Sequence, residues 1–299
     1  MNFKTMKRSS IVFFGLTSPL LAGSFAPRAG VDGSDAIPLD DNRIVAWATT
    51  VEDYQPGEEV IEAWQDTSQV LGPAEGTSFG VCALGRGGEI TVSFGRAIPN
   101  GEGPDFAVFE NSFSPTFLEL AFVEVSSDGE HFFRFPNRSL TLSTGLVEAM
   151  DINGLAGKYE QGYGTPFDLA DLPDSPLLNK GAVTQVRLID IVSGTVEDSE
   201  GSLIFDPFPT VISAGFDCDA IALLEQPQIQ ILGTEIAEDA LRLQWAAELG
   251  VEYRISETED LSGEEWSEFT TILADESIEE IAIPLVAGAT RFFRIEAIQ

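Results

Sequence analysis

Basic residues are scarce in this 299-residue chain. It holds 16 Lys and Arg against 49 Asp and Glu, so its formal net charge is −33. Nucleic acids and anionic lipids are bound by Lys and Arg that replace counterions, and this charge therefore excludes both as partners. An acidic surface attracts divalent cations, and it also keeps an exported protein soluble. The composition alone leaves both explanations open.

Histidine and cysteine are scarcer still, and this limits the chemistry. The chain has one histidine, His131, and two cysteines, Cys82 and Cys218, so a zinc site of the usual ligand set is hard to build. A Ser-His-Asp or Cys-His catalytic unit would need His131, which lies just after a turn in "DGEHFFRF", and we do not expect it. Export would permit a Cys82–Cys218 disulfide that closes a long loop, and two buried free thiols are the equal alternative.

Long apolar runs are absent except at the amino end. There Lys4, Lys7 and Arg8 precede an apolar run over 11–22, and small residues follow it. This order predicts an export signal peptide over 1–24. The run is too short to span a membrane, no Cys follows it as a lipid anchor, and no later stretch reaches roughly 20 apolar residues. We expect a secreted or cell-surface protein without membrane insertion.

Strand patterns fill the next part of the chain. "GGEITVSFG" alternates Ile90, Val92 and Phe94 with polar residues, as a half-buried strand does. "FLELAFVEVSSDGEHFFRF" is broken by the turn dipeptide Asp128-Gly129, which predicts a hairpin. "DFAVFENSF", "VTQVRLIDIVSG" and "GFDCDAIALLE" predict further strands. Short strands with turns between them predict an all-β jelly-roll sandwich over 25–225.

One segment predicts a short helix instead. In "GTPFDLADL", Thr165 is placed as the N-cap, Pro166 at the first helical position, and Asp168 completes a capping box. The glycine-bearing loop "NGLAGKYEQGYG" leads into it. Such loops often bind ligands in sandwiches, and a plain crossover connection is the alternative.

A second module follows Pro227 and covers 226–299. "LRLQWA", "VEYRISET", "EEWSEFTTI", "IEEIAIP" and "RFFRIEA" predict five strands, which suits a small immunoglobulin-like or fibronectin type III-like sandwich. The stretch "LQWAAELGVEYRISETEDLSGEEW" followed by "RFFRIEA" resembles terminal modules of that kind in secreted proteins of environmental bacteria. Such modules are usually spacers or attachment points.

Acidic residues stand inside or at the ends of the predicted strands. In "GFDCDAIAL", alternation places Asp217 and Asp219 in the same row as Ile221 and Leu223. Burying an unpaired carboxylate is costly, so these side chains need a cation, a hydrogen-bond donor or water. Further acids and one amide occupy strand-end positions: Asp105, Glu110, Asn111, Asp190 and Asp206.

Carboxylate and amide oxygens that meet at a strand rim suit Ca²⁺ better than Mg²⁺, which demands stricter geometry. The alternative is that Arg134 and Arg187 pair two of the acids while backbone N–H groups satisfy others. No EF-hand loop is present in the sequence.

Two stretches carry a family resemblance. "VEVSSDGEHFFRF" resembles the strand–turn–strand of discoidin-type, galactose-binding-like jelly rolls, and "GFDCDAIALLE" resembles the closing strand of carbohydrate-binding modules with that fold. The resemblance implies a structural calcium site formed by Asp217 or Asp219 with Asp35 or Asp190. Region 30–225 also resembles uncharacterised bacterial cell-surface proteins, some encoded beside outer-membrane uptake systems for vitamin B12.

We therefore expect a secreted, non-catalytic protein that binds a glycan or another small ligand, with structural calcium. Sugar rings stack on aromatic side chains, and the candidates are Trp47, Trp64, Tyr159 and Tyr163. A glycoside hydrolase that uses an Asp/Glu pair is one alternative. A surface accessory protein of an outer-membrane uptake system, for example for cobalamin, is the other.

Overall fold

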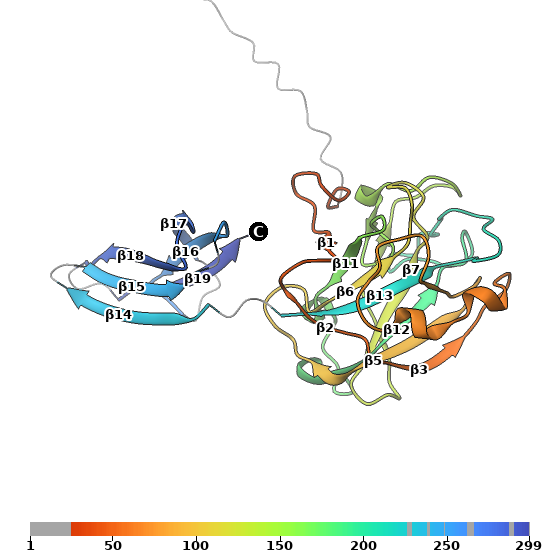
Figure 1. Cartoon of the computed structure of the whole chain (residues 1–299), viewed down its shortest axis with the longest axis horizontal. Coiled ribbons are helices and arrows are strands. Elements are labelled where there is room, and N and C mark those ends of the chain that lie inside the picture. Colours follow the sequence, from red (N-terminus) through yellow and green to blue (C-terminus); the bar gives the residue numbers. More distant parts are fainter. Residues whose placement is uncertain are drawn as a thin grey trace, which may run out of the picture. The chain divides into compact units, whose positions relative to one another are not determined.

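The computed structural model describes residues 25–225, 229–237, 240–247, 249–261, 266–286 and 290–298. The chain divides into two compact units between Leu224 and Glu225. Both units consist of antiparallel strands, and the first adds short 3₁₀ helices (Figure 1). The prediction of an all-β sandwich fold is confirmed. The predicted signal peptide over 1–24 and Pro227 lie outside the described residues.

The first unit is built from two main sheets. One has the strand order β1-β11-β6-β13-β2, with β4 also paired to β13. Its strands are β1 (Ile37–Pro38), β2 (Ile44–Trp47), β4 (Cys82–Ala83), β6 (Phe106–Glu110), β11 (Tyr163–Phe167) and β13 (Asp217–Leu224). The other sheet has the order β3-β5-β12-β7-β8. Its strands are β3 (Thr50–Gln55), β5 (Glu89–Ile98), β7 (Ala121–Ser126), β8 (Phe133–Arg134) and β12 (Val183–Asp190).

Smaller elements connect these strands. A two-stranded ribbon pairs β9 (Arg138–Ser139) with β10 (Ile152–Asn153). The 3₁₀ helices are η1 (Glu62–Trp64), η2 (Thr67–Val70), η3 (Ala149–Asp151), η4 (Leu169–Asp171) and η5 (Lys180–Ala182). In the described residues, no helix is both long and apolar enough to cross a membrane.

The main core lies between the two sheets because alternate residues of each strand point inward. Ile90, Val92 and Phe94 of β5 are buried in this core together with Phe106 and Val108 of β6. The alternation predicted for "GGEITVSFG" is therefore confirmed.

The hairpin predicted at Asp128-Gly129 is also confirmed. The turn joins β7 to β8, which pair antiparallel, and Gly129 has a φ of +78°, a left-handed conformation that favours glycine.

The helix predicted in "GTPFDLADL" is wrong in its start and type. Thr165 and Pro166 lie in β11, which pairs with β6, and a 3₁₀ helix begins only after Asp168. The Asp168 carboxylate caps it by accepting from the N–H of Ala170 at 2.8 Å. Sheet pairing and the burial of Thr165 and Phe167 outweigh the local capping pattern.

The second unit contains two three-stranded sheets, ordered β14-β15-β18 and β17-β16-β19. Its strands are β14 (Ile231–Ala237), β15 (Ala240–Ala246), β16 (Glu252–Thr258), β17 (Ser267–Leu273), β18 (Ile278–Pro284) and β19 (Phe292–Ile298). The five predicted strands are present. The sixth, β14, was not predicted, because it directly follows the segment interpreted as a linker.

Candidate functional site

The two aspartates of β13 lie on the face opposite to the predicted one. Cys218 packs in the same inter-sheet core as Ile221 and Leu223, which an unbroken strand would not allow. A β-bulge after Cys218 shifts the register with β6 by one residue and reverses the alternation. Asp217 and Asp219 flank Cys218, so they do not share the row of Ile221 and Leu223.

Five buried carboxyl groups lie at the end of the sandwich where β13 begins. They are Glu110, Glu119, Asp190, Asp206 and Asp217, and we call them the acidic cluster. They come from the ends of β6 and β12, the segment before β7, the loop leading to β13 and the first residue of β13. Figure 1 shows that loop, in teal, at the same end as the orange segment with η1 and η2. Segments far apart in sequence thus deliver negative charge to one buried place.

Burial raises the pKa of every carboxyl in the acidic cluster, and neighbouring carboxylates add to the effect for all of them except Asp190. The pKa of Glu119 is raised to about 9, first by burial and then by the charge of Asp217. Burial raises the pKa values of Asp206 and Asp217 to about 7 each, and that of Asp190 to about 6. The pKa of Glu110 lies well above its ordinary value for the same reason. Near neutral pH the cluster must therefore hold protons or a cation.

Backbone N–H groups satisfy two of the five carboxylates. Asp190 accepts hydrogen bonds from the N–H groups of Gly87 and Phe216, both at 2.8 Å. Asp206 accepts one from the N–H of Leu120 at 3.2 Å. These bonds connect β12, β13 and the segment before β7, so these two carboxylates have a structural role.

The other three carboxyls each keep one buried oxygen without a hydrogen-bond partner in the described part of the chain. These atoms are Oε1 of Glu110, Oε1 of Glu119 and Oδ1 of Asp217, in side chains whose residues are 1%, 7% and 4% exposed. The second oxygen of Glu110 accepts from the N–H of Ser112 at 2.8 Å, and that of Asp217 accepts from the Asn111 amide at 3.4 Å. A buried carboxylate oxygen without a partner is unfavourable, so these three atoms are candidate cation ligands.

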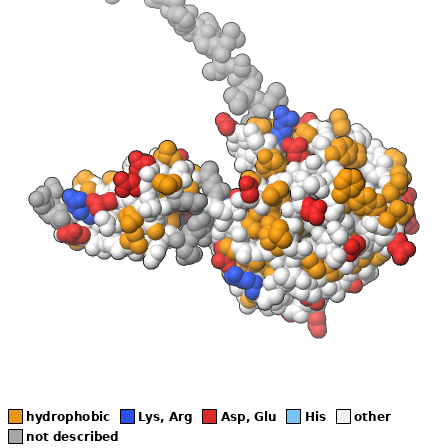
Figure 2. All heavy atoms as spheres, in the orientation of Figure 1, with side chains coloured by type: hydrophobic (Ala, Val, Ile, Leu, Met, Phe, Trp, Pro, Cys, Tyr) orange, Lys and Arg blue, Asp and Glu red, His pale blue; other side chains and the backbone are white. Residues whose placement is uncertain are grey.

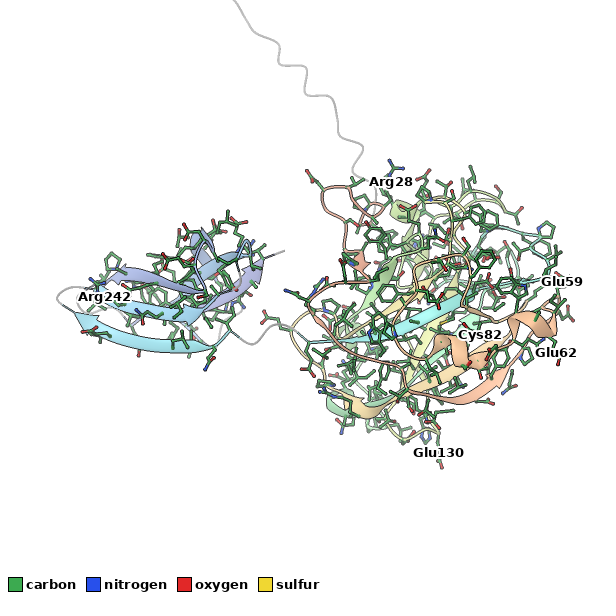
Figure 3. The ribbon with its side chains drawn as sticks, in the orientation of Figure 1. Arg28, Glu59, Glu62, Cys82, Glu130 and Arg242 are labelled. Atoms are coloured by element: carbon green, nitrogen blue, oxygen red, sulfur yellow. The ribbon has the colours of Figure 1, made fainter. Side chains whose placement is uncertain are left out.

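A pocket opens beside the acidic cluster. Its lining includes Glu59, Glu119, Asp190, Asp206 and Thr210. Its cavity volume is about 20 Å³, which holds one water molecule or ion and is too small for a sugar ring. Arg86 lies at its rim, with its guanidinium 5.0 Å from the centre of the Phe208 ring, and it lowers the pKa of Asp190. In Figure 3, Glu59 and Glu62 mark this end of the unit.

Two of the four predicted metal ligands belong to the cluster. Asp190 ends β12 on the face of its inward-pointing residues, as predicted, and its charge raises the pKa of Asp217. Asp219 has a different environment, because its two oxygens accept from the N–H groups of Glu75 and Gly76, each at 2.9 Å. The predicted ligand role of Asp219 would thus compete with two existing hydrogen bonds.

The fourth predicted ligand, Asp35, pairs with other groups. Its carboxylate lies 3.7 Å from the ammonium of Lys158 and accepts a hydrogen bond from the Tyr159 hydroxyl. Across the described ranges, no three or more His, Cys, Asp or Glu side chains are arranged as a metal site as they stand. Any cation would require side-chain rotation.

Arg134 and Arg187 were the alternative partners expected for two of the strand-end acids, but both bind a different carboxylate. Both guanidinium groups bind Glu124 of β7, Arg134 at 2.8 Å. They lie over the rings of Phe122 and Phe132, respectively. These two arginines therefore neutralise Glu124 and not the acidic cluster.

Glu119 was not singled out from the sequence, although the sequence carried a signal for it. In "FLELAFVEV", Glu119 belongs to the same alternating row as Ala121, Val123 and Val125. These three residues all face the main core. Extending that inward row by one step predicts a buried carboxyl.

Three of the four predicted sugar-stacking residues are buried or half-buried beside the sheets. Tyr159 is buried and bound to Asp35. Trp47 of β2 packs against Phe109, with ring centres 5.4 Å apart. Tyr163 is half-buried at the start of β11.

Trp64, the fourth, is also half-buried, but it belongs to a ring pair whose other member is exposed. Its ring stacks on Phe79 with centres 6.3 Å apart and planes 15° from parallel, and Phe79 is 70% exposed. The N–H of Ile61 donates to the carbonyl of Ile212 at 3.0 Å, which ties this segment to the loop before β13. Figure 2 shows hydrophobic and acidic side chains interspersed on one face of this unit, with few basic ones.

The two cysteines are directly opposite one another where β4 pairs with β13. Both are buried, and both are free thiols in the structure. Burial raises the pKa of the Cys218 thiol well above its usual range, so Cys218 stays protonated beside the acidic cluster.

No protein-family model matches the chain, and no curated protein matches it. Among solved structures, the chain is similar to the crystal structure of β-1,2-glucanase from Parabacteroides distasonis, with 11% sequence identity and a TM-score of 0.21. The match covers 72% of this chain and 30% of the glucanase chain, less than a third of its length. A similarity at this TM-score and identity does not define the fold or the function of this chain.

Proposed function

We propose that this chain is an exported, non-catalytic protein that binds neutral glycans at the Trp64–Phe79 ring pair. The main support for this proposal is that the Phe79 side chain is exposed. Its ring lies nearly parallel to that of Trp64 and is not covered by the core. An aromatic face of this kind receives the apolar face of a sugar ring. Fixing the ring beforehand also reduces the entropy lost on binding.

Polar side chains suited to sugar hydroxyls lie close to both rings in the sequence. Asp66 follows Trp64 closely and accepts from the Gln69 side chain at 3.1 Å, and both residues are exposed. Ser78 precedes Phe79 and donates to the Gln161 side chain at 3.0 Å. The net charge of −33 repels acidic polysaccharides, which favours neutral ones as ligands.

The pocket beside the acidic cluster supports a non-catalytic role. Glycoside hydrolysis needs two carboxyl groups on either side of a bound sugar linkage. Glu119, Asp190 and Asp206 have raised pKa values, yet the cavity they line is too small to admit a sugar ring. Incubation with each polysaccharide should therefore release no reducing sugar.

Binding is tested with a panel of neutral and acidic polysaccharides and with cobalamin, using the full chain in calorimetry and affinity electrophoresis. We expect binding to a neutral glycan, and Trp64→Ala and Phe79→Ala should each weaken it about tenfold, the effect of losing roughly 1.4 kcal/mol of stacking. Phe113→Ala is the control, because Phe113 is 68% exposed and stacks on Phe117 in a similar pair. Absence of binding by the folded wild type, or an equal loss in Phe113→Ala, would refute the proposal.

A further inference from the structure

We propose that residues 207–215, which we call the latch, regulate the Trp64–Phe79 ring pair. The latch stays closed over the acidic cluster while the cluster holds protons, and it opens when the cluster ionises. This regulation rests on the proposed function, because the ring pair is the site that the latch would control.

The inner side of the latch covers the acidic cluster. The latch supplies part of the lining of the pocket beside the cluster: Pro207, Phe208, Thr210, Ala214 and Gly215. Glu119 lines the same pocket, and its Oε1 atom is buried without a hydrogen-bond partner among the described residues. The latch also hydrogen-bonds to the cluster through two hydroxyls, of Thr210 with Glu119 and of Ser213 with Asp217. Displacing the latch would therefore expose both carboxyls to water.

The outer side of the latch holds the segment that carries Trp64. The N–H of Ile61 donates to the carbonyl of Ile212 at 3.0 Å, and Val60 forms an isolated β-bridge with Ile212. The N–H of Trp64 in turn donates to the carbonyl of Ile61 at 3.0 Å, so the turn that carries Trp64 starts at the residue that the latch binds. Release of Ile212 would therefore free the Trp64 ring from its fixed position against Phe79.

The backbone is strained on both sides of this contact. Among the described residues, those other than glycine with a positive φ are Glu59, at +66°, and Ile212, at +80°. A left-handed conformation is unfavourable for residues with a Cβ, and most of all for a β-branched one such as Ile212. Glu59, labelled in Figure 3, directly precedes Val60, which pairs with Ile212. Opening is made easier because both residues can relax once they separate.

The charges around Glu119 and Asp217 are mainly negative. The other described carboxyls of the cluster and the pocket are Glu59, Glu110, Asp190 and Asp206. Arg86 supplies positive charge at the pocket, where it acts on Asp190. Burial raises the pKa values of the remaining titratable groups near Asp217, which therefore stay neutral: Tyr54, Cys82 and Cys218. The latch itself contains no charged residue, so it cannot neutralise the cluster.

Proton linkage gives the direction of the regulation. In the closed structure, burial raises the pKa of Asp217 to about 7 and that of Glu119 to about 9. Water that enters on opening would return both pKa values toward their ordinary range. The closed state thus binds protons more tightly, so closure is favoured at low pH and is lost as the pH rises through these values. Glycan binding should therefore weaken at alkaline pH.

The first test is amide hydrogen exchange of the full chain at pH 6 and pH 8.5, corrected for the intrinsic exchange rate at each pH. We expect the protection of residues 207–215 and 59–64 to fall together, at least tenfold, at the higher pH. Low concentrations of urea should hardly change this exchange, because local opening exposes little surface, whereas exchange in β5 and β12 should depend strongly on urea. Unchanged protection of 207–215, or exchange there only through the urea-dependent unfolding shared with β5 and β12, would overturn the proposal.

Three variants identify the groups that control the latch. Glu119→Gln keeps the side-chain shape but cannot ionise, so it should remove most of the pH dependence, and Asp217→Asn should reduce it. Asp105→Asn is the matched control. Asp105 is buried, but its oxygens already accept from the N–H groups of Gly101 at 2.6 Å and Leu169 at 2.7 Å. The latch is refuted if the first two variants open like the wild type, or if Asp105→Asn abolishes the pH dependence.

Calorimetry with laminarin, galactomannan and xyloglucan, which are neutral polysaccharides, tests the effect on binding. The wild type should bind at least tenfold more weakly at pH 8.5 than at pH 6, and Glu119→Gln should lose less affinity. Equal affinity at both pH values would overturn the regulation and leave the glycan function standing. If none of these polysaccharides binds at either pH, the glycan function fails instead, and the exchange of residues 207–215 alone decides whether the latch opens.

Discussion

Raising the pH should destabilise the first unit when no cation is present. The pKa values of Asp206 and Asp217 are raised from 3.8 to about 7 in the folded chain, mainly by burial. A raised pKa means that the folded state binds protons more tightly than the unfolded state. The associated stability is fully present below about pH 4 and is lost as the pH rises through about 7.

The magnitude follows from proton linkage. Between pH 5 and pH 8, each of the two carboxyls should reduce the free energy of unfolding by roughly 2 to 3 kcal/mol, or about 5 kcal/mol together. This is a large part of the 5 to 15 kcal/mol typical of a folded domain. Hydrogen bonds and Arg138 hold the pKa of Asp198 at about 2. Its carboxylate is therefore already ionised at pH 5 and does not offset the loss between pH 5 and pH 8.

The assay is urea unfolding in chelator at pH 5 and pH 8, followed by tryptophan fluorescence. The second unit is an internal control, because none of its described Asp or Glu residues is buried. Equal stability of the first unit at both pH values, or greater stability at pH 8, would refute the assignment of these carboxyls as buried and uncompensated.

Three further predictions concern single positions. Glu119→Gln should raise the melting temperature in chelator at pH 8, because folding then requires no proton uptake at a carboxyl whose pKa is about 9, and a lower melting temperature would contradict this. Gly157→Ala should cost more stability in urea than Gly30→Ala, which should lose about 1 kcal/mol. Both glycines have positive φ, but only at Gly157 does an added Cβ meet the Glu119 carbonyl, so equal losses would count against the close packing. Reductant should leave the melting temperature unchanged, and two thiols should be alkylated in denaturant, because Cys82 and Cys218 are free.

Strand alternation predicted the main sheets because each strand buries one face in a shared core. Ile90, Val92 and Asp190 lie on the predicted faces for this reason. The same rule misplaced Asp217 and Asp219, since a bulge adds one residue to a strand without changing its composition. Local pattern alone therefore identified the strand and assigned the wrong face to its first half.

The acidic cluster was predicted only in part because it depends on contacts between distant segments. Glu110, Asp190, Asp206 and Asp217 were recognised as strand-end acids, but nothing in the sequence selects them over Asp35 and Asp219 as neighbours. Their contacts in the structure separate them from the cluster. Asp219 accepts hydrogen bonds from the backbone N–H groups of Glu75 and Gly76, and Asp35 forms an ion pair with Lys158. Likewise Thr165 follows a capping pattern that β11 overrides by pairing with β6.

The position of β13 has a consequence for when the first unit can fold during synthesis. It is the last strand of its unit, yet it lies in the interior of its sheet, between β6 and β2. Until residue 224 has been synthesised, β2 has no partner in that sheet and the acids at the start of β13 are missing. A nascent chain truncated before Asp217 would leave the edges of β2, β4 and β6 that pair with β13 unpaired, so the unit must fold after its carboxyl end emerges, late and through long-range contacts.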